Sequence, residues 1–141
     1  MLKFIIENNE NYQPGLSIDC VIFGFHDNQL KVLLIKVPHS EKWSLPGGFI
    51  PIDQDIDTAA VTVLNERTGV EGIFLRQFAA FGKIKRNDDH FGKEVLKYLN
   101  IGPEKGKWLT RRFVTIGYYA LVDFLKIVPN RINSNEIIEW I

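Results

Sequence analysis

The stretch Trp43–Val70, WSLPGGFIPIDQDIDTAAVTVLNERTGV, decides the fold, because it combines a glycine turn, a short strand and a capped helix. Gly47 and Gly48 carry no Cβ and let the backbone approach a ligand or another segment closely. Asp55 precedes apolar residues at helical intervals, which predicts the start of a helix there. Gly69 predicts the end of that helix, since glycine accepts the positive φ of a helix C-terminus.

This stretch resembles the signature box of the Nudix hydrolase family, G-x5-E-x7-R-E-U-x-E-E-x-G-U, in which U is apolar. Counting from Gly48 places the second glycine of the box on Gly69, its last apolar residue on Val70 and its central apolar residue on Leu64. In the family, the last three glutamates share one helical face and hold Mg²⁺ against a substrate diphosphate. The resemblance implies an α+β fold, an α/β/α sandwich around a mixed β-sheet, with the box as its loop and helix.

Most charged positions of the box are replaced in this chain. Val63, Glu66 and Arg67 stand at the three helical glutamates, so one carboxylate is kept, one becomes apolar and one becomes a permanent cation. Gln54 stands at the loop glutamate, and Thr62 stands at the box arginine. We therefore expect Mg²⁺ to bind poorly, with Glu66 as a weak residual metal ligand. No catalytic residue is assigned, and we predict little or no hydrolysis.

The composition predicts one soluble domain over residues 1–141. The chain has 141 residues, 45% of them apolar and 24% charged, which is enough for one well-buried core. Seventeen basic residues balance seventeen acidic ones, so no global field favours nucleic acid or anionic membranes. Cys20 is the only cysteine, which excludes an intramolecular disulfide and fits a reducing cytoplasm. No apolar run reaches the roughly twenty residues of a membrane span, and we expect a cytoplasmic location.

Apolar periodicity and turn residues predict five strands besides the short one in the box. They cover residues 16–25, 30–37, 73–82, 113–124 and 136–141. The second of these is apolar nearly throughout, which is typical of a central strand buried on both faces, and the third and fourth are also expected to be central. Asp27 and Asn28 predict a turn between the first two strands.

A helix is predicted between two late strands, within the segment 83–110. Asp88 or Asp89 can cap it, and Gly102 followed by Pro103 ends it. The resemblance implies that this segment is an insertion, because the family usually joins the flanking strands by a short loop. An insertion here would reshape or cover the ligand site.

A second set of residues resembles the Nudix-like sensor domain of Nudix-related transcriptional regulators. The likeness rests on LRQFAAFG at 75–82, RFVTIGYYALV at 112–122 and Arg86 between them. These regulators join the domain to a winged helix and respond to ADP-ribose or a related nucleotide. The resemblance implies a nucleotide partner, and DNA contact only through a C-terminal winged helix. We expect this chain to lack both that winged helix and the last Nudix helix. A homodimer is the assembly to be tested.

The resemblance and the side-chain chemistry together nominate a ligand-binding set. Its members are Lys36, Trp43, Gly47, Gly48, Phe81, Arg86, Arg112 and Tyr118. The basic side chains would face phosphates, although a solvated lysine at a strand end explains Lys36 equally well. The aromatic rings would stack on an adenine. Of Tyr118 and Tyr119, strand alternation turns one toward the core.

The expected function is a sensor domain that binds an ADP-ribose-like nucleoside diphosphate derivative and needs no cofactor. One alternative is a working pyrophosphohydrolase that converts ADP-ribose to AMP and ribose 5-phosphate. That enzyme would hold Mg²⁺ with carboxylates outside the box, such as Asp53, Asp88 or Asp89. The other alternative is an interaction module that kept the fold and lost the ligand.

Overall fold

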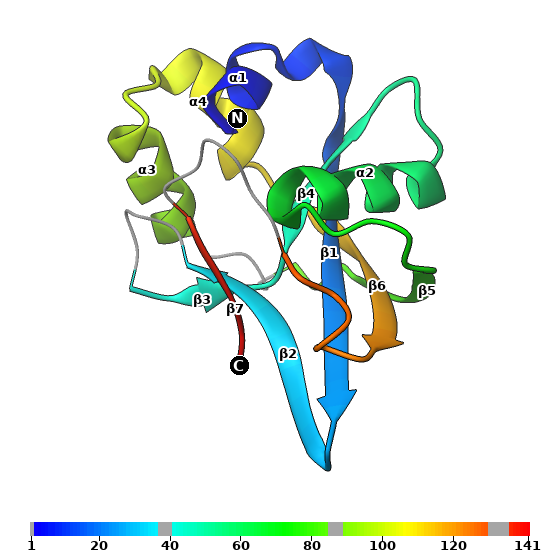
Figure 1. Ribbon diagram of the computed structural model, residues 1–141. Helices are drawn as coiled ribbons and strands as arrows, with labels where there is room; N and C mark the ends of the chain where they lie inside the picture. Colours follow the sequence, from blue (N-terminus) through cyan, green and yellow to red (C-terminus); the bar gives the residue numbers. More distant parts are fainter. Residues whose placement is uncertain (1, 37–40, 85–88, 130–135) are drawn as a thin grey trace.

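The computed structural model describes residues 2–36, 41–84, 89–129 and 136–141, with the backbone alone for 89–92 (Figure 1). Its elements, in order, are α1 (Leu2–Glu7), the short 3-10 helix η1 (Asn9–Asn11), β1 (Tyr12–His26), β2 (Gln29–Lys36), β3 (Trp43–Ser44), β4 (Gly47–Pro51), α2 (Ile56–Thr68), β5 (Arg76–Phe81), α3 (Asp89–Tyr98), α4 (Pro103–Thr110), β6 (Val114–Val122) and β7 (Ile137–Trp140). The box helix and the predicted strands are present. The sequence did not predict α1, β3 or α4.

The strands form one mixed sheet, as predicted. The order is β3-β2-β1-β6-β5, while β4 pairs with β1 and β7 pairs with β2. β1 and β6 run parallel from the pair Leu16 and Val114 to the pair Gly24 and Val122, and the other neighbours are antiparallel. The predicted turn joins β1 to β2, because Asp27 has φ 48° and is followed by a second residue with positive φ, which suits a two-residue hairpin.

The prediction that β5 is a central strand of the sheet is wrong. The prediction that β2 is central and buried on both faces is right only for its central place. β5 lies at the edge of the sheet, and Phe78 and Phe81 are 48% and 42% exposed. Its apolar run reads like a buried strand, but these rings lie on an uncovered face. β2 is an inner strand, yet its burial alternates. Leu33 and Ile35 are fully buried, whereas Leu30 is 64% exposed.

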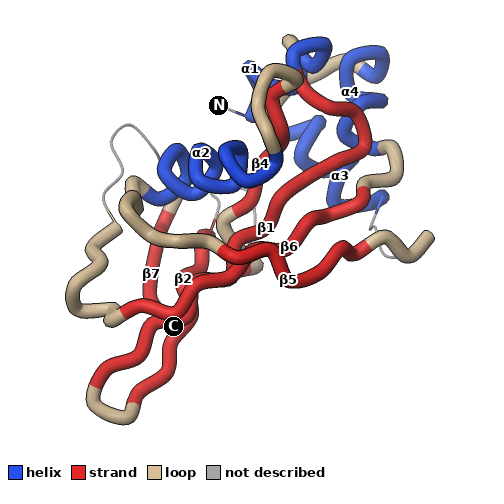
Figure 2. The backbone as a smooth tube through the Cα atoms, turned by 90° about the vertical axis from the view of Figure 1, so that its right-hand side faces the viewer, coloured by secondary structure: helices blue, strands red, loops and turns tan. Residues whose placement is uncertain are grey.

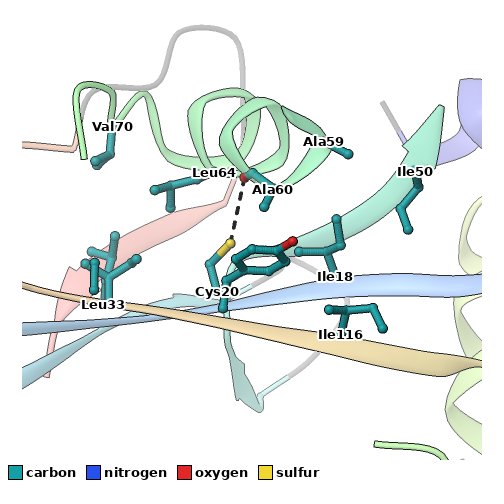
Figure 3. Close-up of a cluster of buried hydrophobic side chains, with 12 residues drawn as sticks. Ile18, Cys20, Leu33, Ile50, Ala59, Ala60, Leu64, Val70 and Ile116 are labelled. Atoms are coloured by element: carbon teal, nitrogen blue, oxygen red, sulfur yellow. Dashed lines mark hydrogen bonds between the residues drawn. The ribbon is translucent and has the colours of Figure 1, made fainter. Parts of the chain in front are cut away.

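α2 begins and ends where the sequence predicts. Asp55 occupies the N-cap position, although its side chain makes no capping hydrogen bond. Gly69 ends the helix in the left-handed conformation at φ 75°, and its N–H bonds to the carbonyl of Asn65. The small side chains of Ala59 and Ala60 let the helix lie close to the sheet. The Cys20 thiol of β1 points at the Ala60 carbonyl at 3.9 Å inside the main core (Figure 3).

The sheet carries helices on both faces at β4. Ile50 points into the main core under α2, and the preceding Phe49 points the other way, against Trp108 of α4 and Phe113, at ring distances of 4.8 and 5.6 Å. α1, α3 and α4 gather around this second core, at one end of the sheet (Figure 2). This arrangement is the predicted α/β/α sandwich.

The described part of the segment 83–110 holds two helices, whereas the sequence predicted one. The predicted helix is α3, and Asp88 lies outside the described residues. Pro103 does follow the end of α3, but it also occupies the first turn of α4, where its missing N–H costs nothing. Gly106 of α4 faces Leu96 of α3, and a Cβ there would overlap that side chain. In the part of the chain that the structure describes, no helix is long and apolar enough to cross a membrane.

Candidate functional site

The Arg67 side chain connects the helix of the box to its glycine strand and to a third segment. Arg67, in the last turn of α2, donates from Nη1 to the carbonyl of Gly47 at 2.8 Å. Its Nη2 donates to the Oε2 of Glu136, just before β7, at 2.9 Å. The two side chains are 26% and 20% exposed. A guanidinium therefore joins α2, β4 and the start of β7 at a position where the family has a glutamate.

The two box glycines approach other segments of the chain. A Cβ on Gly48 would lie 3.0 Å from Cγ2 of Val63. A Cβ on Gly47 would overlap the Asp19 carboxylate and the Ile18 carbonyl. The close backbone approach predicted from the sequence is therefore present, and it serves packing between β4, α2 and β1.

The other two glutamate positions of the helix differ in environment. Val63 is 5% exposed and packs against Gly48, while Glu66 is exposed. Burial, and then the charge of Glu66, raise the pKa of Tyr12. Among the described residues, no three His, Cys, Asp or Glu side chains are grouped as a metal site would require.

Two buried polar atoms at box positions have no hydrogen-bond partner within the described structure. They are Oε1 of Gln54 and Nε of Arg67. A buried polar group without a partner typically costs about 1–3 kcal/mol. Nε of Arg67 is therefore a hydrogen-bond donor without an acceptor, next to Nη2, which donates to Glu136.

Lys36 and Trp43 lie apart from Arg67. Leu33 belongs to the core under α2, so Lys36, three residues along β2, leaves the opposite face of the sheet. Trp43 is the register partner of Lys36, shares that face and is 38% exposed. Lys36 forms an ion pair with Glu41 at 3.1 Å. The structure therefore places Lys36 and Trp43, two of the predicted ligand-binding residues, next to each other. They lie on the face of the sheet opposite Arg67.

The predicted cations near β5 and β6 are not both visible. Arg112 is exposed and donates from Nη2 to the carbonyl of Gly82, which ties the end of β5 to the start of β6. Arg86 lies outside the described residues. Phe81 is exposed on β5, at a ring distance of 5.9 Å from Phe78.

The role predicted for Tyr118 needs correction. Its ring is 1% exposed in the main core, and its hydroxyl donates to Oδ1 of Asp57 in the first turn of α2. Burial and this hydrogen bond raise the pKa of Tyr118. The ring cannot stack on a ligand from there, because helix and sheet enclose it. As alternation predicted, its neighbour faces outward, with Tyr119 38% exposed.

Tyr119 belongs to an apolar hollow that the sequence did not indicate. The hollow is lined by Val21, Phe23, Phe78 and Tyr119, on the sheet face opposite α2, and has a volume of about 230 Å³. Glu136 was also missed as a site residue. It is 69 residues from Arg67, and no spacing rule links a strand end to a helix at that distance.

A mixed sheet that carries a glycine strand and a helix in this box frame defines a Nudix-like domain. No protein-family model matches the chain. The ADPR responsive transcriptional repressor NtrR of Acinetobacter baylyi is 30% identical over 133 residues, which cover 91% of this chain and 44% of that protein. The chain thus spans less than half the length of this curated relative.

Solved structures of NrtR from Shewanella oneidensis are similar in fold and sequence. Its Nudix domain complexed with ADP ribose has a TM-score of 0.62 and 26% identity, covering 95% of this chain and 80% of that one. Its complex with a 27mer DNA has a TM-score of 0.56 and 28% identity, covering 79% and 44%. The chain is therefore a Nudix-like domain, similar to those of NrtR-type regulators.

Proposed function

We propose that this domain binds an adenosine diphosphate derivative such as ADP-ribose as a sensor, and that its box does not support metal-dependent hydrolysis. The similarity to an ADPR responsive repressor and to an NrtR domain complexed with ADP ribose supports the choice of ligand. Control of transcription belongs to the proposal only for a protein that joins this domain to a DNA-binding one.

The observation that carries the proposal is the cation at Arg67. Its guanidinium is held between the Gly47 carbonyl and the Glu136 carboxylate, so it cannot swing freely away from the box. At about 4 Å and an effective dielectric of about 20, the guanidinium alone would repel each unit of charge on a metal ion by about 4 kcal/mol, and the carboxylate of Glu136 would offset part of that repulsion. The chain itself supplies positive charge at this place, and an anionic ligand needs no bridging ion.

The apolar contact of Val63 supports the same conclusion. The side chain fills the space next to Gly48, so that position of the helix contributes packing where the family contributes a metal ligand. Glu66 alone offers at most two oxygens, whereas Mg²⁺ requires six ligands. Water could complete such a shell, but among the described residues no group of three His, Cys, Asp or Glu side chains forms around Glu66.

The test of this function is a product assay. Wild-type protein is incubated with ADP-ribose and millimolar Mg²⁺ or Mn²⁺, and AMP is followed by ion-exchange chromatography. We expect no AMP above the rate without protein. AMP release at about one turnover per second or faster, the ordinary range of enzymes, would overturn the proposal in favour of a pyrophosphohydrolase.

A further inference from the structure

The guanidinium of Arg67 has one fixed partner and one partner on a separate segment. The Gly47 carbonyl belongs to β4, which lies under α2 in the same packed unit. Glu136 lies immediately before β7, whose first register pair is Ile137 with Lys36. The ion pair therefore ties β7 to the box at its N-terminal end.

The other end of β7 has its own anchors. The indole of Trp140 donates to the carbonyl of Ile127 at 3.3 Å, and Val32 and Ile141 exchange two backbone hydrogen bonds at 2.8 and 2.9 Å. Loss of the Glu136 contact would therefore loosen the start of β7 while its end stays paired.

We propose that Arg67 is a phosphate-binding residue, and that Glu136 is the internal anion which a phosphate group of the ligand displaces. This inference rests on the proposed function, because it takes the ligand to be a nucleoside diphosphate derivative. The Arg67 and Glu136 side chains are 26% and 20% exposed, so the pair borders solvent. Nε of Arg67 is itself buried, and the phosphate would reach it in the space that Glu136 leaves.

The donors of Arg67 favour a phosphate over the present carboxylate. Nη2 bonds one carboxylate oxygen, and the neighbouring Nε has no partner. Nε and Nη2 lie on one edge of the planar guanidinium, and a phosphate can accept from both of them at once. An incoming phosphate would make two charge-assisted hydrogen bonds along that edge, where Glu136 makes one through Nη2.

Glu136 would compete with the phosphate group of the ligand for Arg67, and this competition can be measured. If Glu136 holds Arg67 for about nine tenths of the time, the apparent affinity for a phosphate ligand is reduced about tenfold. Removing the charge of Glu136 should restore that factor. Ligand binding should also release the N-terminal end of β7 from the box. The mobility of that strand end would then depend on whether the site holds a ligand.

The experiment compares wild type with Glu136→Gln and with Glu139→Gln as a matched control. Glu139 is an exposed carboxylate within β7, three residues after Glu136, so both variants lose one negative charge at or next to this strand. Calorimetry measures binding of ADP-ribose and, separately, of inorganic pyrophosphate. Hydrogen exchange of residues 137–141 is measured with and without each ligand.

We expect Glu136→Gln to bind both ligands about tenfold more tightly, and Glu139→Gln to bind them like wild type. In wild type, either ligand should speed exchange at Ile137; in Glu136→Gln, exchange there should already be fast. Equal affinities for all three proteins, or exchange that no ligand changes, would overturn the inference while ADP-ribose binding itself leaves the proposed function standing.

Pyrophosphate binding tests the Arg67 site independently of the proposed function. If ADP-ribose binds to none of the three proteins, the proposed function fails. A tenfold higher affinity of Glu136→Gln than of wild type for pyrophosphate would still support the Arg67 site, and equal affinities would overturn it. Arg67→Lys is a second variant in case Glu136→Gln does not fold. Lysine keeps the charge and loses the two-donor edge, so affinity for pyrophosphate should fall about tenfold, and an unchanged affinity would count against the inference.

Discussion

Arg67 and Glu136 are 69 residues apart in the sequence, and Nη2 of the first lies 2.9 Å from Oε2 of the second. This contact, with the bond from Arg67 to the Gly47 carbonyl, gathers α2, β4 and the start of β7 around one guanidinium. An arginine of the box helix therefore lies where these three segments meet.

Gly48→Ala is expected to destabilise the domain by about 1–3 kcal/mol, because the new Cβ would lie 3.0 Å from Val63. Val63→Ala opens space at that contact, so the double variant should lose at least about 0.5 kcal/mol less than the sum of the two single losses. Urea unfolding measures all three.

Gly82→Ala is the matched control, since a Cβ there meets Val114 only at 3.4 Å, an ordinary contact. It should change the free energy of unfolding by no more than about 0.5 kcal/mol. Strict additivity of Gly48→Ala and Val63→Ala would show that the two positions do not touch.

Val63→Glu is expected to lower the free energy of unfolding by about 2 kcal/mol or more at neutral pH. The position is 5% exposed, and a carboxylate there loses its water. Val61→Glu on the same helix is the control, because Val61 is 47% exposed and should tolerate the charge. Similar thermal midpoints for the two variants would mean that Val63 faces solvent.

Tyr118→Phe removes a buried hydroxyl that donates to the Asp57 carboxylate, so we expect a loss of about 1.5–3 kcal/mol. Tyr119→Phe removes an outward hydroxyl on the neighbouring residue and should be nearly neutral. Chemical denaturation of both variants tests the contact. A larger loss for Tyr119→Phe would reverse the assignment of the two faces of β6.

Cys20 gives the domain a pH dependence at alkaline pH. Burial, and then the Asp19 charge, raise the pKa of the Cys20 thiol from 9.0 to about 12. Between these values the unfolded chain releases the proton and the folded chain keeps it, so stability falls as pH rises, by up to about 1.4 kcal/mol per unit. Cys20→Ala should show a shallower fall between pH 9 and 11, and parallel curves would contradict this assignment.

Local chemistry allowed much of the fold to be predicted. Asp55 and Gly69 mark the ends of α2 because capping depends on a few adjacent residues. Asp27 and Asn28 mark the hairpin because few residues accept positive φ. β5 was predicted to be central but lies at the edge of the sheet. An apolar run shows that a strand is hydrophobic, but it does not show whether other strands flank it. α4 was missed because Pro103 can end one helix and begin the next.

The site was less predictable, because its contacts join distant segments. The frame of the box identified the position of Arg67, and the sequence predicted a cation there in place of the glutamate of the family motif. Its partner Glu136 was not, since the approach of β7 to α2 depends on how β7 pairs with β2. Tyr118 and Tyr119 show the same limit. Alternation separates their faces, but only the packed helix determines which face is closed.

We propose that the box binds a nucleotide with a cation of its own chain in place of a metal. Calorimetry of the wild-type protein with ADP-ribose, first in EDTA and then in millimolar Mg²⁺, tests it most directly, with Arg67→Gln as the comparison. We expect the same dissociation constant for wild type in both buffers, within about twofold, and weaker binding by Arg67→Gln in each. Binding by wild type that occurs only when Mg²⁺ is supplied would contradict it.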